Sequence, residues 1–153
     1  MQDARARWPF VPIWDNHEFS WMGWQSILRV PGEERPAQTR KVTANQAWFE
    51  YQPARVAKSG GVALERFEAP AVKDAPIGDF DGEGLGQEPN NLAAIGSLTG
   101  YRSLRWGQHL DLIITDQHSY RSEDPSGRPE ASAFSSNDFP NLIPQEAIEI
   151  LDA

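Results

Sequence analysis

The alternation of apolar and polar residues predicts a β-hairpin late in the chain. Residues 101–106 alternate as a half-buried strand does, and residues 110–115 form a short apolar run that ends at Asp116. The tripeptide Gly107-Gln108-His109 stands between the two runs, and a short link containing glycine is typical of a hairpin turn. We therefore expect two antiparallel strands, with His109 exposed in the turn.

The clearest helix is predicted over residues 38–51. Four apolar residues there have the i, i+3, i+4, i+7 spacing of one helical stripe: Ala44, Ala47, Trp48 and Tyr51. Pro53 is expected to end the helix, because proline lacks the backbone N–H that a continuing helix needs.

The residues before this helix are less regular. Residues 8–14 are apolar and contain two prolines, which predicts a short extended segment or an edge strand. Residues 19–29 carry Trp21, Trp24, Ile27 and Leu28 at three- and four-residue spacing, which fits a short helix or an ordered loop. Residues 31–36 combine proline, glycine and charge, and predict a loop.

The centre and the end of the chain predict long loops. Residues 57–100 form a loop-rich insertion, within which residues 78–86 indicate a flexible acidic loop. Residues 90–95 predict a short helix capped by an asparagine. Residues 119–140 predict another loop, and residues 144–151 begin as a helix does, with proline first.

Composition excludes several classes of protein. The 153 residues include no cysteine, which excludes disulfides, zinc ribbons and thiol catalysis. The 22 acidic and 14 basic residues give a net charge of −8, which argues against a nucleic-acid-binding surface, because phosphate backbones need a basic face. The chain has neither a signal sequence nor an apolar run long enough for a membrane span.

The strongest candidate for chemistry is the polar run Asp15-Asn16-His17-Glu18, which follows the apolar segment. An amide oxygen and carboxylates are ligands for hard cations, and histidine can bind a metal or transfer a proton near neutral pH. The alternative is a solvated polar loop. Aromatic neighbours favour a site, since the four side chains of Trp14, Phe19, Trp21 and Trp24 would exclude water from the loop.

Four blocks of sequence resemble one enzyme family. Asn16-His17-Glu18 resembles the Asn-His-Asp/Glu block of calcineurin-like metallophosphoesterases, and residues 12–18 resemble the Trp-Asp-Asp-His-Glu block of PhoD-like alkaline phosphatases and phosphodiesterases. Residues 45–53, 101–107 and 112–121 resemble later blocks of the PhoD-like family in the same order. The resemblance spans residues 11–121.

The resemblance implies roles for the first block. Asn16 would ligate one ion of a dinuclear metal centre, with iron and calcium the expected metals. His17 would contact the scissile phosphate and stabilise the transition state or protonate the leaving group. Asp15 and Glu18 would hold Asn16 and His17 in position without binding the metal or the substrate themselves.

The last block, residues 112–121, implies an anion-binding site, but it matches the family pattern less completely than the first block does. Arg121 would bind a phosphate group, although an arginine after a strand pairs with a neighbouring acid as often. His118 stands where the family usually has arginine, which puts the anion-binding role of that position in doubt. His118 and Arg121 are nevertheless both candidates for substrate binding.

The resemblance also implies a fold and a reaction. The expected fold class is α/β, part of a metallophosphatase β-sandwich flanked by helices, with long loops. The expected reaction is hydrolysis of a small-molecule phosphoester by a metal-bound hydroxide, in a periplasmic or extracellular protein.

Other metal-ligand blocks of the superfamily do not occur in the chain. We therefore expect residues 1–153 to be the central part of one phosphatase domain, inactive in isolation. The alternative is a non-catalytic fragment that binds a ligand or a partner.

Overall fold

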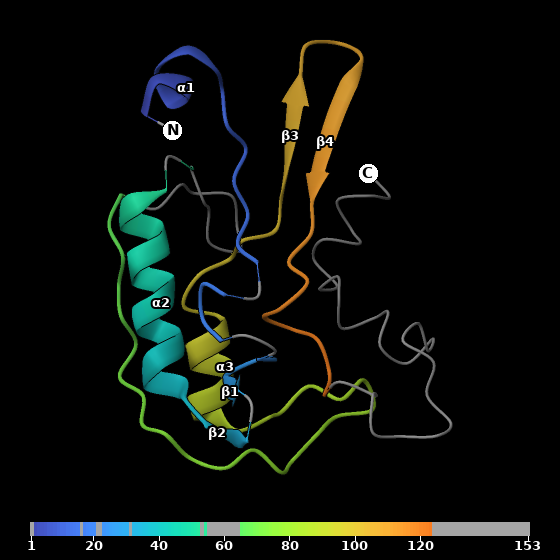
Figure 1. The fold of residues 1–153 in the computed structure, drawn as a ribbon. Helices are drawn as coiled ribbons and strands as arrows, with labels where there is room; N and C mark the ends of the chain where they lie inside the picture. The colour runs from blue at the N-terminus through green and yellow to red at the C-terminus, as the bar shows by residue number, and fades with distance from the viewer. Residues whose placement is uncertain are drawn as a thin grey trace.

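The computed structural model describes residues 2–15, 17–20, 23–30, 32–52, 54 and 65–123. Its elements, in chain order, are α1 (Gln2–Arg7), β1 (Ile27–Val30), β2 (Glu33–Pro36), α2 (Gln38–Tyr51), α3 (Pro89–Ile95), β3 (Arg102–Trp106) and β4 (Leu110–Ile114). Helix α2 packs against α3, and the strands form two antiparallel pairs, β1–β2 and β3–β4 (Figure 1). This mixture of helices and strands agrees with an α/β chain. The metallophosphatase sandwich stays a prediction, because the described strands form two separate two-stranded sheets.

Helix α2 has the predicted bounds, but it buries a different face. The buried positions are Gln38, Lys41, Val42, Asn45 and Trp48, whereas Tyr51 of the predicted stripe is 77% exposed. The polar members of this face have partners: Gln38 Nε2 donates to the Ala75 carbonyl at 3.0 Å, and Asn45 Nδ2 donates to Ser97 Oγ at 2.7 Å. An apolar pattern misses this face, because hydrogen bonds allow the burial of polar side chains.

Before α2, residues 27–30 and 33–36 are strands, where a short helix or ordered loop and then a loop were predicted. Residues 27–36 form the β1–β2 hairpin, in which Val30 pairs with Glu33 and Ile27 pairs with Pro36. Gly32 has a φ of +80°, a conformation that tight hairpin turns need and that glycine adopts without strain. The predicted loop over residues 31–36 is therefore wrong for residues 33–36, which form a strand.

The N-terminal apolar segment is not a strand. Residues 9–15 have no regular secondary structure, and they follow the short helix α1, which the sequence pattern did not predict. Arg102 of β3 holds this segment through a hydrogen bond from Nη2 to the Pro12 carbonyl at 2.5 Å. The prolines at 9 and 12 lack the N–H groups that a strand ladder would need.

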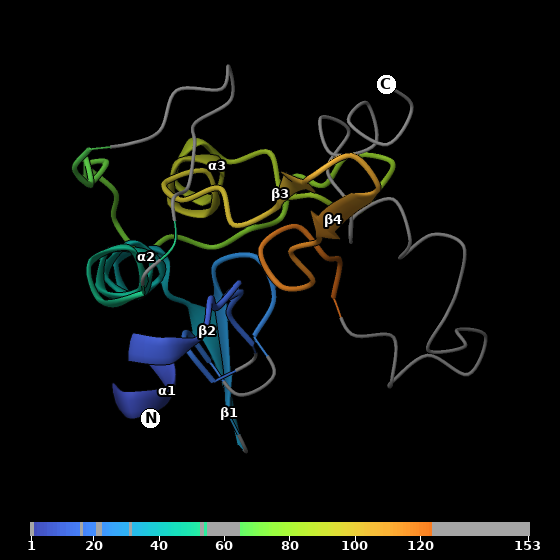
Figure 2. The same ribbon diagram turned by 90° about the horizontal axis from the view of Figure 1, so that it is seen from above.

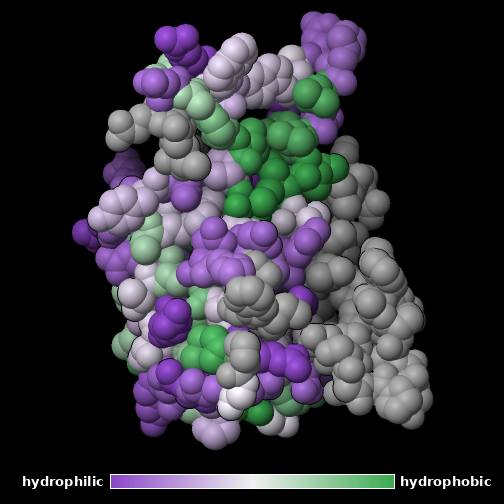
Figure 3. All heavy atoms as spheres, in the orientation of Figure 1, coloured by the Kyte–Doolittle hydropathy of each residue, from purple (hydrophilic) through white to green (hydrophobic). Residues whose placement is uncertain are grey.

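The β3–β4 hairpin confirms the prediction for residues 101–115. Arg102 pairs with Ile114 and Trp106 with Leu110, and Gly107 takes the turn with a φ of +67°. The apolar side chains of β4 are more exposed than a half-buried strand requires. Figure 3 shows a hydrophobic patch at the level of this hairpin, where exposed Leu110, Leu112 and Ile113 lie.

The central segment is more ordered than predicted. Residues 65–88 run beside α2 and beneath α3 without helix or strand (Figures 1 and 2). The expected flexible loop at 78–86 is closed by a bridge between Phe80 and Gly86, and Asp81 Oδ1 accepts hydrogen bonds from two backbone amides inside it. The predicted short helix is confirmed as α3, but Pro89 begins it and no asparagine caps it.

Two small apolar clusters lie in the core of the described part of the chain. One contains Trp14, Trp48 and Leu98, and the other contains Phe19, Leu28 and Ala37. Because Trp14 and Phe19 belong to different clusters, the polar run between them is anchored at both ends. Residues 53, 55–64 and 124–153 lie outside the described residues, and so does the predicted helix at 144–151.

Candidate functional site

The loop after Trp14 is braced by one of its own acids. The backbone N–H of Asp15 donates to Glu18 Oε2 at 2.7 Å, which closes the loop on itself. The chain then re-enters the interior at Phe19 and Ser20, and the Ser20 hydroxyl both accepts from the Arg29 amide at 2.8 Å and donates to the Arg29 carbonyl at 3.0 Å. His17 is therefore presented to solvent on a loop whose two ends are fixed.

A second polar turn follows β4. Asp116 is fully buried, and its Oδ1 accepts hydrogen bonds from the backbone amides of His118 at 3.0 Å and Ser119 at 2.9 Å. A carboxylate that accepts two amides two and three residues later stabilises a tight turn. The prediction that β4 ends at a polar residue thus has a structural cause, because Asp116 reverses the chain and points His118 back toward the first loop.

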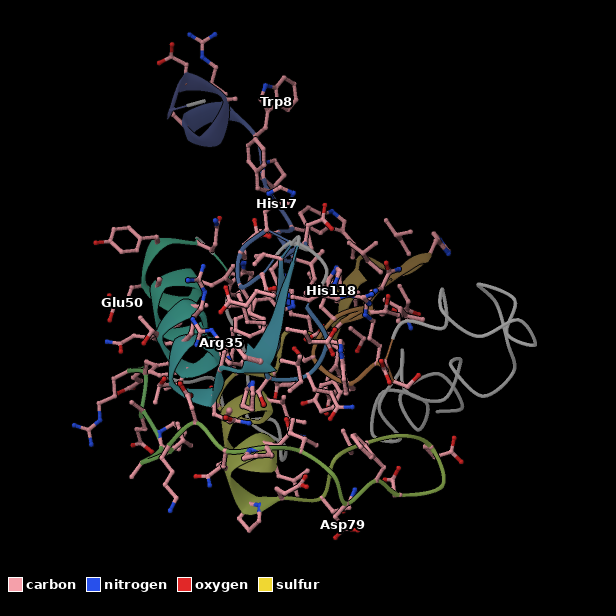
Figure 4. The ribbon with its side chains drawn as sticks, turned by 60° about the horizontal axis from the view of Figure 1, so that its bottom comes forward. Trp8, His17, Arg35, Glu50, Asp79 and His118 are labelled. Carbon is pink, nitrogen blue, oxygen red and sulfur yellow. The ribbon has the colours of Figure 1, made fainter. Side chains whose placement is uncertain are left out.

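The two turns meet at Asp15 and His118. His118 Nε2 lies 3.4 Å from Asp15 Oδ1, and the histidine side chain is 18% exposed while the aspartate is 85% exposed. A groove of about 550 Å³ lies here, with apolar walls from β4 and the N-terminal segment and with Asp15 and His118 among its lining residues. Residues 103 positions apart therefore share one surface, and Figure 4 shows His17 and His118 on the two separate segments.

Burial keeps His118 neutral. Removal of the imidazole from water lowers its pKa below the usual 6.5, and the positive charges of Arg121 and Lys41 lower it further, against the opposing effects of Asp116 and Asp15. Its Nδ1 has no hydrogen-bond partner among the described residues. A neutral imidazole has one ring nitrogen free to accept a proton or a hydrogen bond at neutral pH.

Lys41 of α2 lies beneath both turns. Its ammonium is 3.6 Å from the ring centroid of Trp14 and 5.1 Å from that of Phe19, and it donates to Ser119 Oγ at 3.2 Å. The side chain is 1% exposed, and burial lowers its pKa to about 7, although the charge of Asp116 acts in the other direction. A desolvated cation over an aromatic ring contributes about 2 kcal/mol.

Gln25 ties the second turn to the rest of the fold. It is fully buried with a φ of +49°, and its Nε2 donates to the Gly84 carbonyl at 2.9 Å and the Arg121 carbonyl at 3.1 Å. Its Oε1 accepts from the Gly86 amide at 3.0 Å and from Asn91 Nδ2 at 2.8 Å. One amide side chain thus joins residue 25 to residues 84–91 and to Arg121 through four hydrogen bonds.

The predicted site residues fall into three groups. Asp15, Glu18, His118 and Arg121 lie around the two turns, and His17 is exposed on the first of them. Asn16, the predicted metal ligand, lies outside the described residues. Lys41 and Gln25 were missed, since the first interrupts an apolar stripe and the second lies in a mixed segment. Helical spacing could have revealed Lys41, because it shares a helix face with Val42, Asn45 and Trp48.

The donor set of the described residues does not fit a dinuclear metal centre. No group of three or more histidine, aspartate or glutamate side chains close enough to hold an ion occurs in the described part of the chain. Asp116 commits one carboxylate oxygen to its own turn, and Glu18 commits one to the Asp15 amide. The iron and calcium that the family resemblance implies therefore stay a prediction.

Comparison with known proteins identifies the family. A model of the PhoD-like phosphatases matches residues 1–143. No curated protein and no solved structure matches the chain significantly. No helix in the part of the chain that the structure describes is long and apolar enough to cross a membrane. Since the match covers far more than half of the sequence, the chain belongs to the PhoD-like phosphatase family.

Proposed function

We propose that the chain takes part in the hydrolysis of phosphoesters and carries the phosphate-facing part of the site. The observation that carries the proposal is the meeting of the Asp15–Glu18 loop with the Asp116–Arg121 turn, which brings Asp15 and His118 together in the wall of one groove. Arg121 lies close enough to His118 to lower its pKa. The family match supports the reaction class.

His17 is the residue that we assign to the phosphate. Its side chain is exposed, so it can reach a substrate without displacing the core. In the proposed reaction, water attacks phosphorus and the bond to the leaving oxygen breaks, so that oxygen must gain a proton or lose charge. An imidazole can donate that proton or a hydrogen bond.

His118 and Arg121 complete the assignment on the other turn. The lowered pKa of His118 leaves it neutral, and its Nε2, 3.4 Å from Asp15 Oδ1, is the ring nitrogen that can meet a ligand, since Nδ1 is buried. Arg121 supplies a positive charge that lowers the pKa of His118. The same charge would attract a phosphate, which the net charge of −8 would otherwise repel. Glu18 and Asp15 keep the first loop in place.

Binding of dimethyl phosphate, followed by ³¹P NMR, tests this proposal. We expect His17→Ala to weaken binding by about tenfold, the loss of one hydrogen bond to a charged group. His109→Ala is the matched control, because His109 is exposed in the β3–β4 turn, and it should bind as the unchanged chain does. Equal binding by the His17 variant, or no binding by the unchanged chain, would contradict the proposal.

A further inference from the structure

One buried cation touches both ends of the candidate loop and the opposite turn. The ammonium of Lys41 lies over the ring of Trp14, which precedes the loop, and close to the ring of Phe19, which follows it. Its hydrogen bond goes to Ser119 in the second turn. A cavity of only about 10 Å³ remains where Trp14, Phe19, Lys41 and His118 meet, so the contacts are close-packed.

We infer that Lys41 is a positioning residue, which fixes the Asp15–Glu18 loop against the Asp116–Arg121 turn and so sets the distance between Asp15 and His118. The alignment of the two turns would serve phosphate binding, and in this respect alone the inference rests on the proposed function. The geometry itself does not depend on any ligand.

Three features of the structure support this role over simple packing. Helix α2 is anchored through hydrogen bonds of its buried Asn45 and Gln38, so Lys41 projects from a base that is tied to other segments. Asp116 lies close enough to favour the charged form of Lys41. A buried ammonium also costs folding free energy, since burial lowers its pKa to about 7, and an apolar side chain of the same length would avoid that cost.

The pKa of His118 reports the alignment without any substrate. Asp15 raises this pKa across the 3.4 Å contact, so Asp15→Asn should lower it in the unchanged chain. If Lys41 sets the contact, Lys41→Met should reduce the effect of Asp15→Asn to less than half. The four proteins of this cycle are compared by NMR titration of the His118 imidazole, and the cycle isolates coupling from the direct effect of either change.

Two further variants keep the test decisive. Lys73→Met removes an exposed lysine and should leave the Asp15→Asn effect at full size. Ser119→Ala removes the hydrogen-bond partner of Lys41 while it keeps the charge, and it should reduce the effect even if Lys41→Met does not fold. An Asp15→Asn effect of unchanged size in both the Lys41 and the Ser119 backgrounds would overturn the inference. Because no phosphate is added, this outcome is independent of whether the proposed function holds.

Discussion

Burial of Lys41 makes the stability of the fold depend on pH in a calculable way. Its pKa falls from 10.5 to about 7 on folding, chiefly because burial disfavours the charged form. Between these two values the unfolded chain binds a proton that the folded chain has released. Stability therefore rises with pH across this window, by up to about 1.4 kcal/mol for each pH unit.

The full effect amounts to about 5 kcal/mol between pH 7 and pH 10.5, comparable with the whole stability of many domains. The perturbation that isolates it is Lys41→Met, which keeps an unbranched side chain but cannot titrate. Over the accessible range from pH 7 to pH 9, the unchanged chain should gain about 2–3 kcal/mol relative to this variant.

Urea unfolding followed by tryptophan fluorescence at several pH values measures this difference. Lys73→Met is the control, because Lys73 is exposed, and its stability should follow that of the unchanged chain. His118 does not confuse the result, since its lowered pKa confines its own contribution to pH values below about 6.5. If the Lys41 variant and the unchanged chain kept a constant difference from pH 7 to pH 9, the assigned pKa would be wrong.

Three further changes test the fold and the second turn. Gly23→Ala should lower the free energy of unfolding by about 1–3 kcal/mol, because an added Cβ would lie 2.7 Å from a backbone carbonyl of β1. Gly82→Ala is its control in the same urea assay and should cost little, because nothing lies within 4 Å of a Cβ added there. Gln25→Ala should cost about 3 kcal/mol, since it removes four hydrogen bonds and leaves their partners in the interior without Gln25. Gln46→Ala on the exposed face of α2 should stay within about 0.5 kcal/mol. Equal losses within either pair would contradict the assigned contacts. The lowered pKa of His118 predicts that stability falls as pH drops below about 6.5, and His118→Gln should lessen that fall; an unchanged acid limb of the unfolding curve would refute the burial of its neutral form.

The parts of the fold that sequence predicted are those governed by local periodicity. Helix α2 and the β3–β4 hairpin depend on spacing and on one glycine turn, and both appear at the predicted positions. The β1–β2 hairpin was missed because its second strand is charged and exposed, a composition shared with loops.

The buried face of α2 depends on partners that no local pattern contains. Gln38 bonds to a residue 37 positions away and Asn45 to one 52 positions away. Such pairs become visible only when the chain is folded, and for the same reason Lys41 and Gln25 were not recognised as part of the site.

The candidate site was found by its residue types and not by its geometry. The polar run at 15–18 and the Asp116–Arg121 segment were both singled out, but nothing in the sequence brought Asp15 and His118 to within 3.4 Å. That contact depends on the Asp116 turn and on the anchoring of Trp14, which are tertiary features. The chemistry assigned to His17 and Asn16 stays a prediction.

The central claim is that the two turns form one phosphate-binding site. The chain contains three histidines, His17 and His118 in the two turns and His109 exposed in the β3–β4 turn, so a single NMR titration with dimethyl phosphate observes the site and its control together. We expect the imidazole signals of His17 and His118 to shift along one saturation curve with the same Kd, while those of His109 stay in place. Separate curves for His17 and His118, or a response of all three in proportion to the added salt, would contradict it.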